Sequence, residues 1–113
     1  MMKIGYFLTA DGGYSGHITT LTLDIGVSLM AIEPSANENA PDYRVISDEG
    51  DEGEEAREIG AGWKRTGEKA GDYVAIQIDD PMFVTPLRAN LFKEDGNAHV
   101  LIWSRPVRQD KAD

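Results

Sequence analysis

Hydrophobic and polar residues alternate in short runs along most of this chain, and glycine or proline residues separate the runs. In residues 25–33, for example, Ile25, Val27 and Leu29 share one face, while glycine, serine and methionine occupy the other. Alternation with a period of two predicts a β-strand, because successive side chains of a strand point to opposite sides. The other strand-like runs are residues 3–9, 16–23, 43–47, 61–66, 73–79, 87–92 and 99–105.

Turn signals separate these runs about every eight to twelve residues, as at residues 11–13 (Asp-Gly-Gly) and 95–97 (Asp-Gly-Asn). Short strands joined by frequent turns are typical of antiparallel β-domains. We therefore predict an all-β fold, an antiparallel barrel or compact sandwich of seven or eight short strands. The expected core residues are Ile4, Tyr6, Leu21, Leu23, Val27, Leu29, Val74, Ile76, Leu91 and Trp103.

A chain of 113 residues has room for one domain. Residues 1–106 contain all the strand patterns and are predicted to form it, while the polar residues 107–113 form a frayed tail. Residues 48–58 read Asp-Glu-Gly-Asp-Glu-Gly-Glu-Glu-Ala-Arg-Glu and are predicted to be an exposed acidic loop. A helix over residues 52–59 is the alternative, because several residues favour helices, although Gly53 and charge repulsion oppose it.

Negative charge is concentrated in the first half of the chain. Residues 1–60 contain 12 acidic and 3 basic side chains, whereas residues 61–113 contain 8 of each, so the first half carries the whole formal net charge of −9. A strong local negative field attracts cationic surfaces. We therefore expect a non-catalytic interaction protein that docks on an unidentified protein with a basic surface. The expected docking residues are Asp48, Glu49, Asp51, Glu52, Glu54, Glu55 and Glu58.

The second half combines basic and aromatic residues, and this combination supports an alternative function. Aromatic rings beside cationic side chains on a sheet can stack the bases of single-stranded nucleic acid. The net charge opposes attraction to phosphate unless one face is locally basic, and tryptophans in strands often pack in the core instead. Tyr73 and Phe92 add rings to the main candidates. These candidates are Trp63, Lys64, Arg65, Arg88, Trp103, Arg105 and Arg108.

Few residues of the chain suit catalysis or metal binding. Cysteine is absent, which excludes disulfides, thiolate catalysis and zinc–thiolate sites. His17 and His99 each lie within a strand pattern without a surrounding motif, and we expect both at a sheet surface. A calcium-loop template that starts at Asp48 fails at Gly50 and Ile59. We therefore expect no enzyme activity, no catalytic residue, no cofactor and no metal site.

The sequence also bears on the cellular compartment. No apolar run approaches the roughly 18 residues that a membrane helix needs. The first eleven residues lack the apolar stretch of a secretion signal, and the absence of cysteine suits a reducing compartment. We expect a cytoplasmic protein that does not contact membranes, and the sequence leaves its oligomeric state open.

Several segments of the chain carry a family resemblance. In order, they read Ala-Pro-Asp-Tyr-Arg-Val at 40–45, Gly-Ala-Gly-Trp-Lys at 60–64, Asp-Asp-Pro at 79–81, Ala-Asn-Leu-Phe at 89–92 and Leu-Ile-Trp-Ser-Arg-Pro at 101–106. Together with Ile4-Gly5 and residues 21–23, they resemble the bacterial family known as domain of unknown function 736 over nearly the whole chain. The acidic residues 48–58 depart from the shorter connection of that family.

The resemblance implies a small bacterial protein that is often carried on conjugative plasmids, integrative elements and phages. It implies no established activity and no site residues. Mobile elements need accessory proteins that handle DNA or blunt host defences. A nucleic-acid-processing or host-defence complex is therefore the partner we expect, with carboxylates imitating phosphates as an anti-restriction or anti-CRISPR-like protein would.

Overall fold

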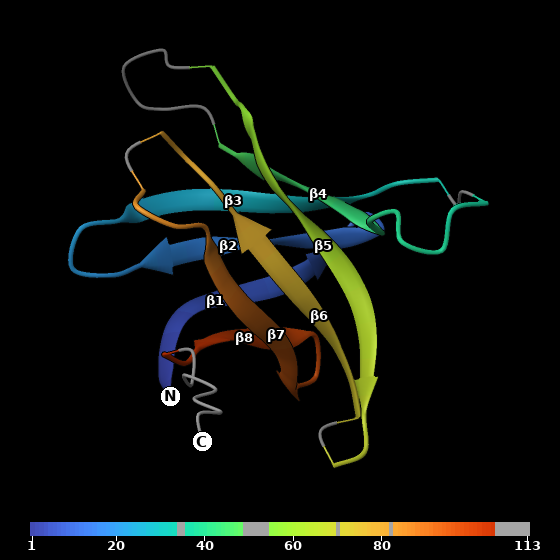
Figure 1. The fold of residues 1–113 in the computed structure, drawn as a ribbon. Helices are drawn as coiled ribbons and strands as arrows, with labels where there is room; N and C mark the ends of the chain where they lie inside the picture. The colour runs from blue at the N-terminus through green and yellow to red at the C-terminus, as the bar shows by residue number, and fades with distance from the viewer. Residues whose placement is uncertain (34–35, 49–54, 70, 82, 106–113) are drawn as a thin grey trace, which may run out of the picture.

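A computed structural model describes residues 1–33, 36–48, 55–69, 71–81 and 83–105. It is a closed antiparallel barrel in which each strand pairs with the next along the chain and β8 pairs with β1 (Figure 1). The prediction of an all-β barrel is therefore confirmed. None of the residues described belongs to a helix that would be long and apolar enough to cross a membrane. The strands are β1 (Met2–Ala10), β2 (Gly13–Thr19), β3 (Asp24–Ala31), β4 (Tyr43–Ser47), β5 (Glu58–Gly67), β6 (Gly71–Ile78), β7 (Leu87–Asp95) and β8 (Ala98–Trp103).

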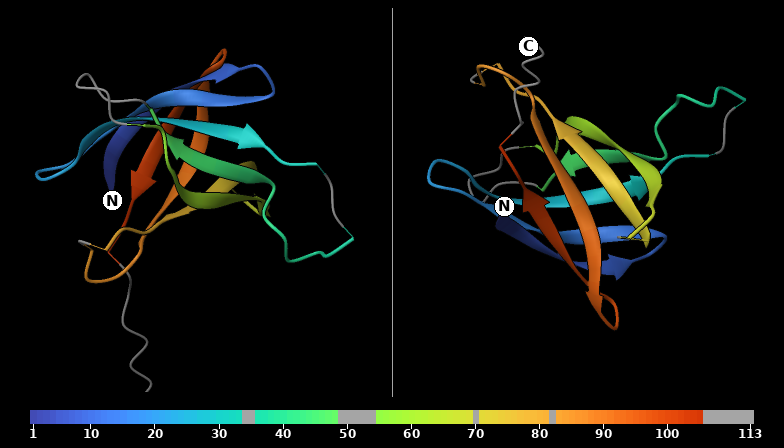
Figure 2. Two further views of the ribbon diagram at one scale, coloured as in Figure 1. Left: turned by 90° about the horizontal axis from the view of Figure 1, so that it is seen from above. Right: turned by 60° about the horizontal axis from the view of Figure 1, so that its bottom comes forward.

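Because the strands run alternately up and down, the connections gather at two ends of the barrel. We call one end the mouth; it comprises the start of β1, the connections that follow β2, β4 and β6, and the residues after β8. The far end comprises the other connections, of which that between β3 and β4 reaches away from the barrel (Figure 2). Residues 48–57 connect β4 to β5, and Glu58, the last residue of the acidic segment 48–58, begins β5, so both described ends of the segment lie at the mouth.

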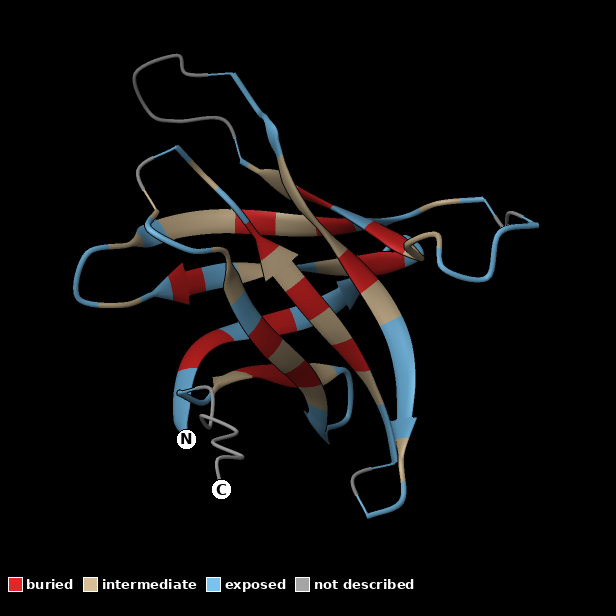
Figure 3. Ribbon diagram, in the orientation of Figure 1, coloured by how far each residue is buried: buried red, intermediate tan, exposed pale blue. Residues whose placement is uncertain are grey.

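Alternation along each strand places one face inside the barrel, as the bands of burial along β6 and β7 show (Figure 3). In β6, Val74, Ile76 and Ile78 are buried, whereas the residues between them are partly exposed. Leu23 and Trp103 pack against the edge of the resulting core. Its members are Ile4, Phe7, Ile18, Val27, Leu29, Tyr43, Val45, Val74, Ile76, Ile78, Ala89, Leu91 and Leu101.

The prediction that Tyr6 lies in the core is wrong, because β1 contains a bulge. The pairing of β1 with β8 shifts register between Lys3 and Gly5, so the consecutive residues Ile4 and Gly5 are both buried. An extra residue in one strand inverts the alternation that follows it. Phe7 therefore points into the core, and Tyr6 lies on the outer face with 60% of its surface exposed.

The prediction that Leu21 lies in the core is also wrong, because β2 ends earlier than its pattern suggested, at Thr19. The Thr20 hydroxyl accepts hydrogen bonds from the backbone N–H groups of Thr22 (3.3 Å) and Leu23 (3.0 Å). A threonine hydroxyl that binds nearby backbone in this way favours a turn over a strand. The turn leaves the Leu21 side chain fully exposed at the mouth.

Candidate functional site

The acidic segment is described only at its two ends. The Asp48 carboxylate accepts a hydrogen bond from the Ser28 hydroxyl at 3.4 Å. Glu58 is the first residue of β5, and its carboxylate lies 2.9 Å from a guanidinium nitrogen of Arg44. Both groups therefore have partners within the barrel, whereas Glu55 is exposed. The other predicted docking residues, Glu49, Asp51, Glu52 and Glu54, lie outside the described residues.

The structure does not bring the predicted basic and aromatic residues together on one surface. Alternation along β5 and β8 sends neighbouring side chains to opposite sides of the sheet. Trp63, Arg65 and Arg88 lie on the outer face, whereas Trp103 and Arg105 lie at the mouth. Lys64 lies near the far end, over the buried Tyr43 ring. Arg108 lies outside the described residues.

One group of side chains does form a continuous surface on the outside of the barrel. Tyr73 of β6 pairs in register with Phe92 of β7, Phe92 with Val100 of β8, and Val100 with Tyr6 of β1. Side chains of paired residues lie side by side on the same face of a sheet. We call these four residues the aromatic row. Their chain neighbours Val74, Leu91, Leu101 and Phe7 all belong to the core, so the aromatic row faces outward.

The aromatic row has a stacked ring pair at one end and a more exposed ring at the other. The ring centroids of Tyr73 and Phe92 are 5.3 Å apart, with 33° between the ring planes. Val100 is only 6% exposed, although it lies on the outer face, because its neighbours cover it. Tyr6, which pairs with Val100, is 60% exposed. The surface therefore has two aromatic platforms with an apolar floor between them.

Basic side chains border the aromatic row. Arg65 of β5 pairs in register with Tyr73 and extends the row by one residue. Lys3 Nζ lies 5.8 Å from the Tyr6 ring centroid and 3.3 Å from Glu94 Oε2. Gln77 and Arg88 also lie on this outer face, and a hydrogen bond joins their side chains.

Arg88 Nε donates a hydrogen bond of 3.1 Å to Gln77 Oε1. The terminal guanidinium nitrogens of Arg88 have no hydrogen-bond partner among the described residues. A guanidinium fixed through Nε keeps its terminal N–H groups available for an anion. The cationic groups next to the aromatic row are therefore Arg65 on β5 and Lys3 on β1, while Arg88 lies four residues before Phe92 along β7.

His17 lies at the other end of this surface, where it pairs in register with Tyr6. Its Nε2 contacts a carboxylate oxygen of Asp24. A nucleophilic site would require a hydroxyl or another nucleophile beside this pair. Within the described ranges, no hydrogen bond joins His17 to a hydroxyl, and no three histidine or carboxylate side chains converge as metal ligands.

The expectation that His99 lies at a sheet surface is wrong, because its side chain points into the barrel and is only 9% exposed. Its Nδ1 lies 3.3 Å from the carbonyl oxygen of Asn97, and its ring meets the Tyr14 ring edge-on with 4.8 Å between centroids. Burial and the nearby Tyr43 phenol raise the pKa of Tyr14. Tyr14 therefore stays a neutral hydrogen-bond donor, and these aromatic residues fill the far end of the barrel interior.

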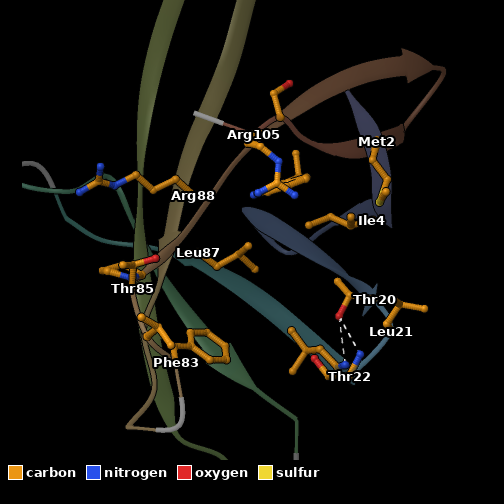
Figure 4. A pocket seen from close by; sticks show the side chains of 15 residues that line it. Met2, Ile4, Thr20, Leu21, Thr22, Phe83, Thr85, Leu87, Arg88 and Arg105 are labelled. Atoms are coloured by element: carbon orange, nitrogen blue, oxygen red, sulfur yellow. Dashed lines mark hydrogen bonds between the residues drawn. The ribbon is translucent and has the colours of Figure 1, made fainter. Parts of the chain in front are cut away.

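A pocket of about 900 Å³ opens at the mouth (Figure 4). Ile4, Leu87 and Arg105 point toward its middle, whereas Arg88 points away from it. The Arg105 guanidinium lies over the Trp103 ring, with 5.4 Å from its central carbon to the ring centroid. The pocket therefore combines an apolar lining with one inward-pointing cation.

Sequence reasoning missed two features of these sites. Tyr6 and Lys3 were not assigned to the nucleic-acid surface, because the alternation placed Tyr6 in the core. The connection between β6 and β7, which supplies Phe83 and Val84 to the pocket, carried no motif. Its one signal is the pair of prolines at 81 and 86, which marks a loop between two strands.

The sequence matches the protein-family model described as "Protein of unknown function (DUF736)" over residues 3–106. The match covers most of the chain, so the chain belongs to this family, as the resemblance of its segments indicated. No curated protein and no solved structure matches the chain.

Proposed function

We propose that this DUF736 protein is a non-catalytic binding protein that holds single-stranded nucleic acid across the aromatic row. The observation that carries the proposal is the in-register line of Tyr73, Phe92, Val100 and Tyr6 on the outside of the barrel. Outward aromatic rings on a sheet stack unpaired bases, and each stacked base contributes about 1–3 kcal/mol. Bases in a duplex are already stacked and cannot reach such rings. The surface therefore suits single strands.

The distribution of charge supports this location. Asp24 is the one acidic residue within β1 to β4, and the other described acidic residues up to Asp48 lie in the connections between strands. The aromatic row lies mainly on the second-half strands, Arg65 and Lys3 border it, and Arg88 lies farther along β7 on the same outer face. A local basic border can attract phosphate despite the net charge of −9.

Fluorescence anisotropy with labelled single-stranded oligonucleotides, measured over a series of salt concentrations, tests the proposal. Neutralising about three phosphates on a single strand gives a log–log slope of roughly −2 for affinity against salt. We expect binding at low salt with a slope near that value and much weaker binding of the matching duplex. Failure of every single strand to bind at low salt, or equal affinity for the duplex, would contradict the proposal.

Docking of the acidic segment on a basic partner protein is the second candidate function. The observation that favours it is that the described ends of the acidic segment, Asp48 and Arg57, lie at the mouth, the end of the barrel at which the pocket also opens. Loops that gather at one end of a rigid barrel often carry binding residues. The partner we propose is a nucleic-acid-processing or host-defence complex of the cell that harbours a mobile element.

Neutralising the acidic segment is expected to abolish capture of this partner. The variant changes Glu49, Asp51, Glu52, Glu54 and Glu55 to the corresponding amides, and it keeps Asp48 because the Ser28 hydroxyl binds that carboxylate. The measurement is affinity capture from a host lysate at two salt concentrations, because screened charges bind less strongly.

A matched control removes the same number of charges elsewhere, at Asp11, Glu33, Glu38, Glu68 and Asp72. Docking by the acidic segment requires that the control keep the partner while the segment variant loses it. If both variants and the wild type recover the same proteins, the acidic segment is only a solvated surface.

A further inference from the structure

The pocket at the mouth lies apart from the aromatic row, and its dimensions suit a small molecule. Its volume of about 900 Å³ falls in the range of small-ligand sites, which often occupy the mouths of β-barrels. Ile4 and Trp103 close its inner side, where they belong to the core or pack against it. A stable protein interface would need about 800 Å² from each partner. A concave site of this size instead favours a compact ligand.

The lining of the pocket is mainly apolar and comes from separate parts of the chain. Leu23 follows the turn after β2, Phe83 lies in the connection between β6 and β7, and Leu87 begins β7. Leu21 and Val84 add side chains that are fully exposed to water. Exposed apolar side chains that surround a cavity mark a binding site, because a ligand removes them from water. The ligand therefore has an apolar body.

Arg105 adds a positive charge to this apolar surface. Its guanidinium lies against the Trp103 ring, and a cation–π contact of this kind holds the group while its N–H edges stay available. Arg105 has no ion pair within the described part of the chain. Arg105 is an exposed residue at the opening of the pocket, and a guanidinium there binds carboxylate or phosphate through two parallel hydrogen bonds. The ligand therefore has an anionic head group.

We propose that the mouth pocket binds a small anionic amphiphile, with the apolar body against Leu87, Phe83 and Ile4 and the head group on Arg105. The proposal is independent of nucleic-acid binding on the aromatic row. The shared chemistry of a carboxylate or a phosphate head group is what Arg105 recognises, and the two kinds of ligand are separated by experiment.

Isothermal titration of the full-length protein with decanoate, decyl phosphate and decanol, each below its micelle concentration, tests the proposal. We expect one anion per protein and at least about tenfold weaker binding of the neutral decanol, because a charge-assisted hydrogen bond is lost. The tighter of the two anions identifies the preferred head group. Arg105→Gln is expected to reduce affinity for the anions about tenfold and to leave affinity for decanol unchanged.

Lys69→Gln removes one positive charge at the far end of the barrel and is the matched control, which should leave all three affinities unchanged. Thermal unfolding of each variant confirms that it is folded. The proposal is overturned if none of the three ligands binds, or if decanol binds as tightly as decanoate. Unchanged anion affinity in Arg105→Gln would also overturn it.

Two further results would assign the pocket to another occupant. Displacement of decanoate by a single-stranded oligonucleotide would make the mouth part of the nucleic-acid surface. Light scattering that shows a dimer, together with dissociation of that dimer by Leu21→Ser, would make the pocket an interface between two copies. Either result overturns the proposal.

Discussion

Changing Tyr6 to alanine is expected to weaken binding of single-stranded oligonucleotides about tenfold, while the protein stays folded. The ring forms one of the two platforms of the aromatic row. Losing one stacked base weakens binding by about 1–3 kcal/mol, which is roughly 5- to 150-fold in affinity. The side chain is 60% exposed, so its removal opens no cavity in the core. Anisotropy titration at low salt measures the loss.

Two matched variants separate stacking from other causes. Tyr6→Phe keeps the ring and removes only the hydroxyl, so it should bind almost as well as the wild type. Leu8→Ala removes an apolar side chain of β1 that is also on the outer face, with 54% of its surface exposed, but lies beyond the aromatic row. It should bind normally.

Three outcomes with these variants and with Phe92→Ala would contradict base stacking on the aromatic row. If Leu8→Ala weakens binding as much as Tyr6→Ala, a general apolar contact replaces base stacking as the explanation. If Tyr6→Phe is as weak as Tyr6→Ala, the hydroxyl and not the ring is responsible. If Phe92→Ala has no effect while Tyr6→Ala does, the nucleic acid does not extend along the aromatic row.

The strands were predictable from the sequence because alternation is a local property. Each strand-like run overlaps one observed strand, and the run at residues 43–47 coincides with β4. Burial on one face of a sheet requires a period of two, and this period is visible in the residues themselves. The all-β class and the number of strands followed from it.

The charge asymmetry along the chain does not become two sides of different charge on the barrel. A meander keeps neighbours in the sequence as neighbours in space, but β1 to β4 contain Asp24 together with Lys3 and Arg44, and the other acidic residues up to Asp48 lie in connections. Charge counts could therefore not indicate which side chains on the outer face would meet.

The aromatic row was not predictable, because its residues meet only through pairing between distant strands. Val100 lies beside Tyr6 because β8 pairs with β1 and closes the barrel. The bulge in β1 then decides whether Tyr6 or Phe7 faces outward. Closure and bulge both depend on the partner strand, whereas the alternation pattern of β1 reports only on β1 itself.

The mouth pocket escaped prediction for a related reason. Trp103 and Arg105 were singled out as nucleic-acid residues because their types fit, yet their positions at the end of β8 place them beside loops. Loop residues such as Phe83 and Leu21 follow no period that a sequence pattern could detect. A site built from strand ends and loops appears only when the connections are placed at one end of the barrel.

Changing Phe7 to alanine is expected to lower the free energy of unfolding by about 3–5 kcal/mol. The Phe7 side chain is only 1% exposed and lies among the largest residues of the core, so its removal leaves a cavity. Natural domains have a total stability of about 5–15 kcal/mol, so the variant loses a large share of it. Urea denaturation followed by circular dichroism measures the midpoint and the slope.

Tyr6→Ala is the matched control, because the bulge in β1 determines which of these adjacent rings is buried. A substitution at an exposed position away from the core usually changes the free energy of unfolding by no more than about 0.5 kcal/mol. Phe7→Leu keeps most of the buried volume and should remain folded at a smaller cost of about 1 kcal/mol. If Tyr6→Ala destabilises the barrel more than Phe7→Ala or Phe7→Leu does, β1 has the regular alternation of the sequence pattern and no bulge. The aromatic row would then lose its β1 platform.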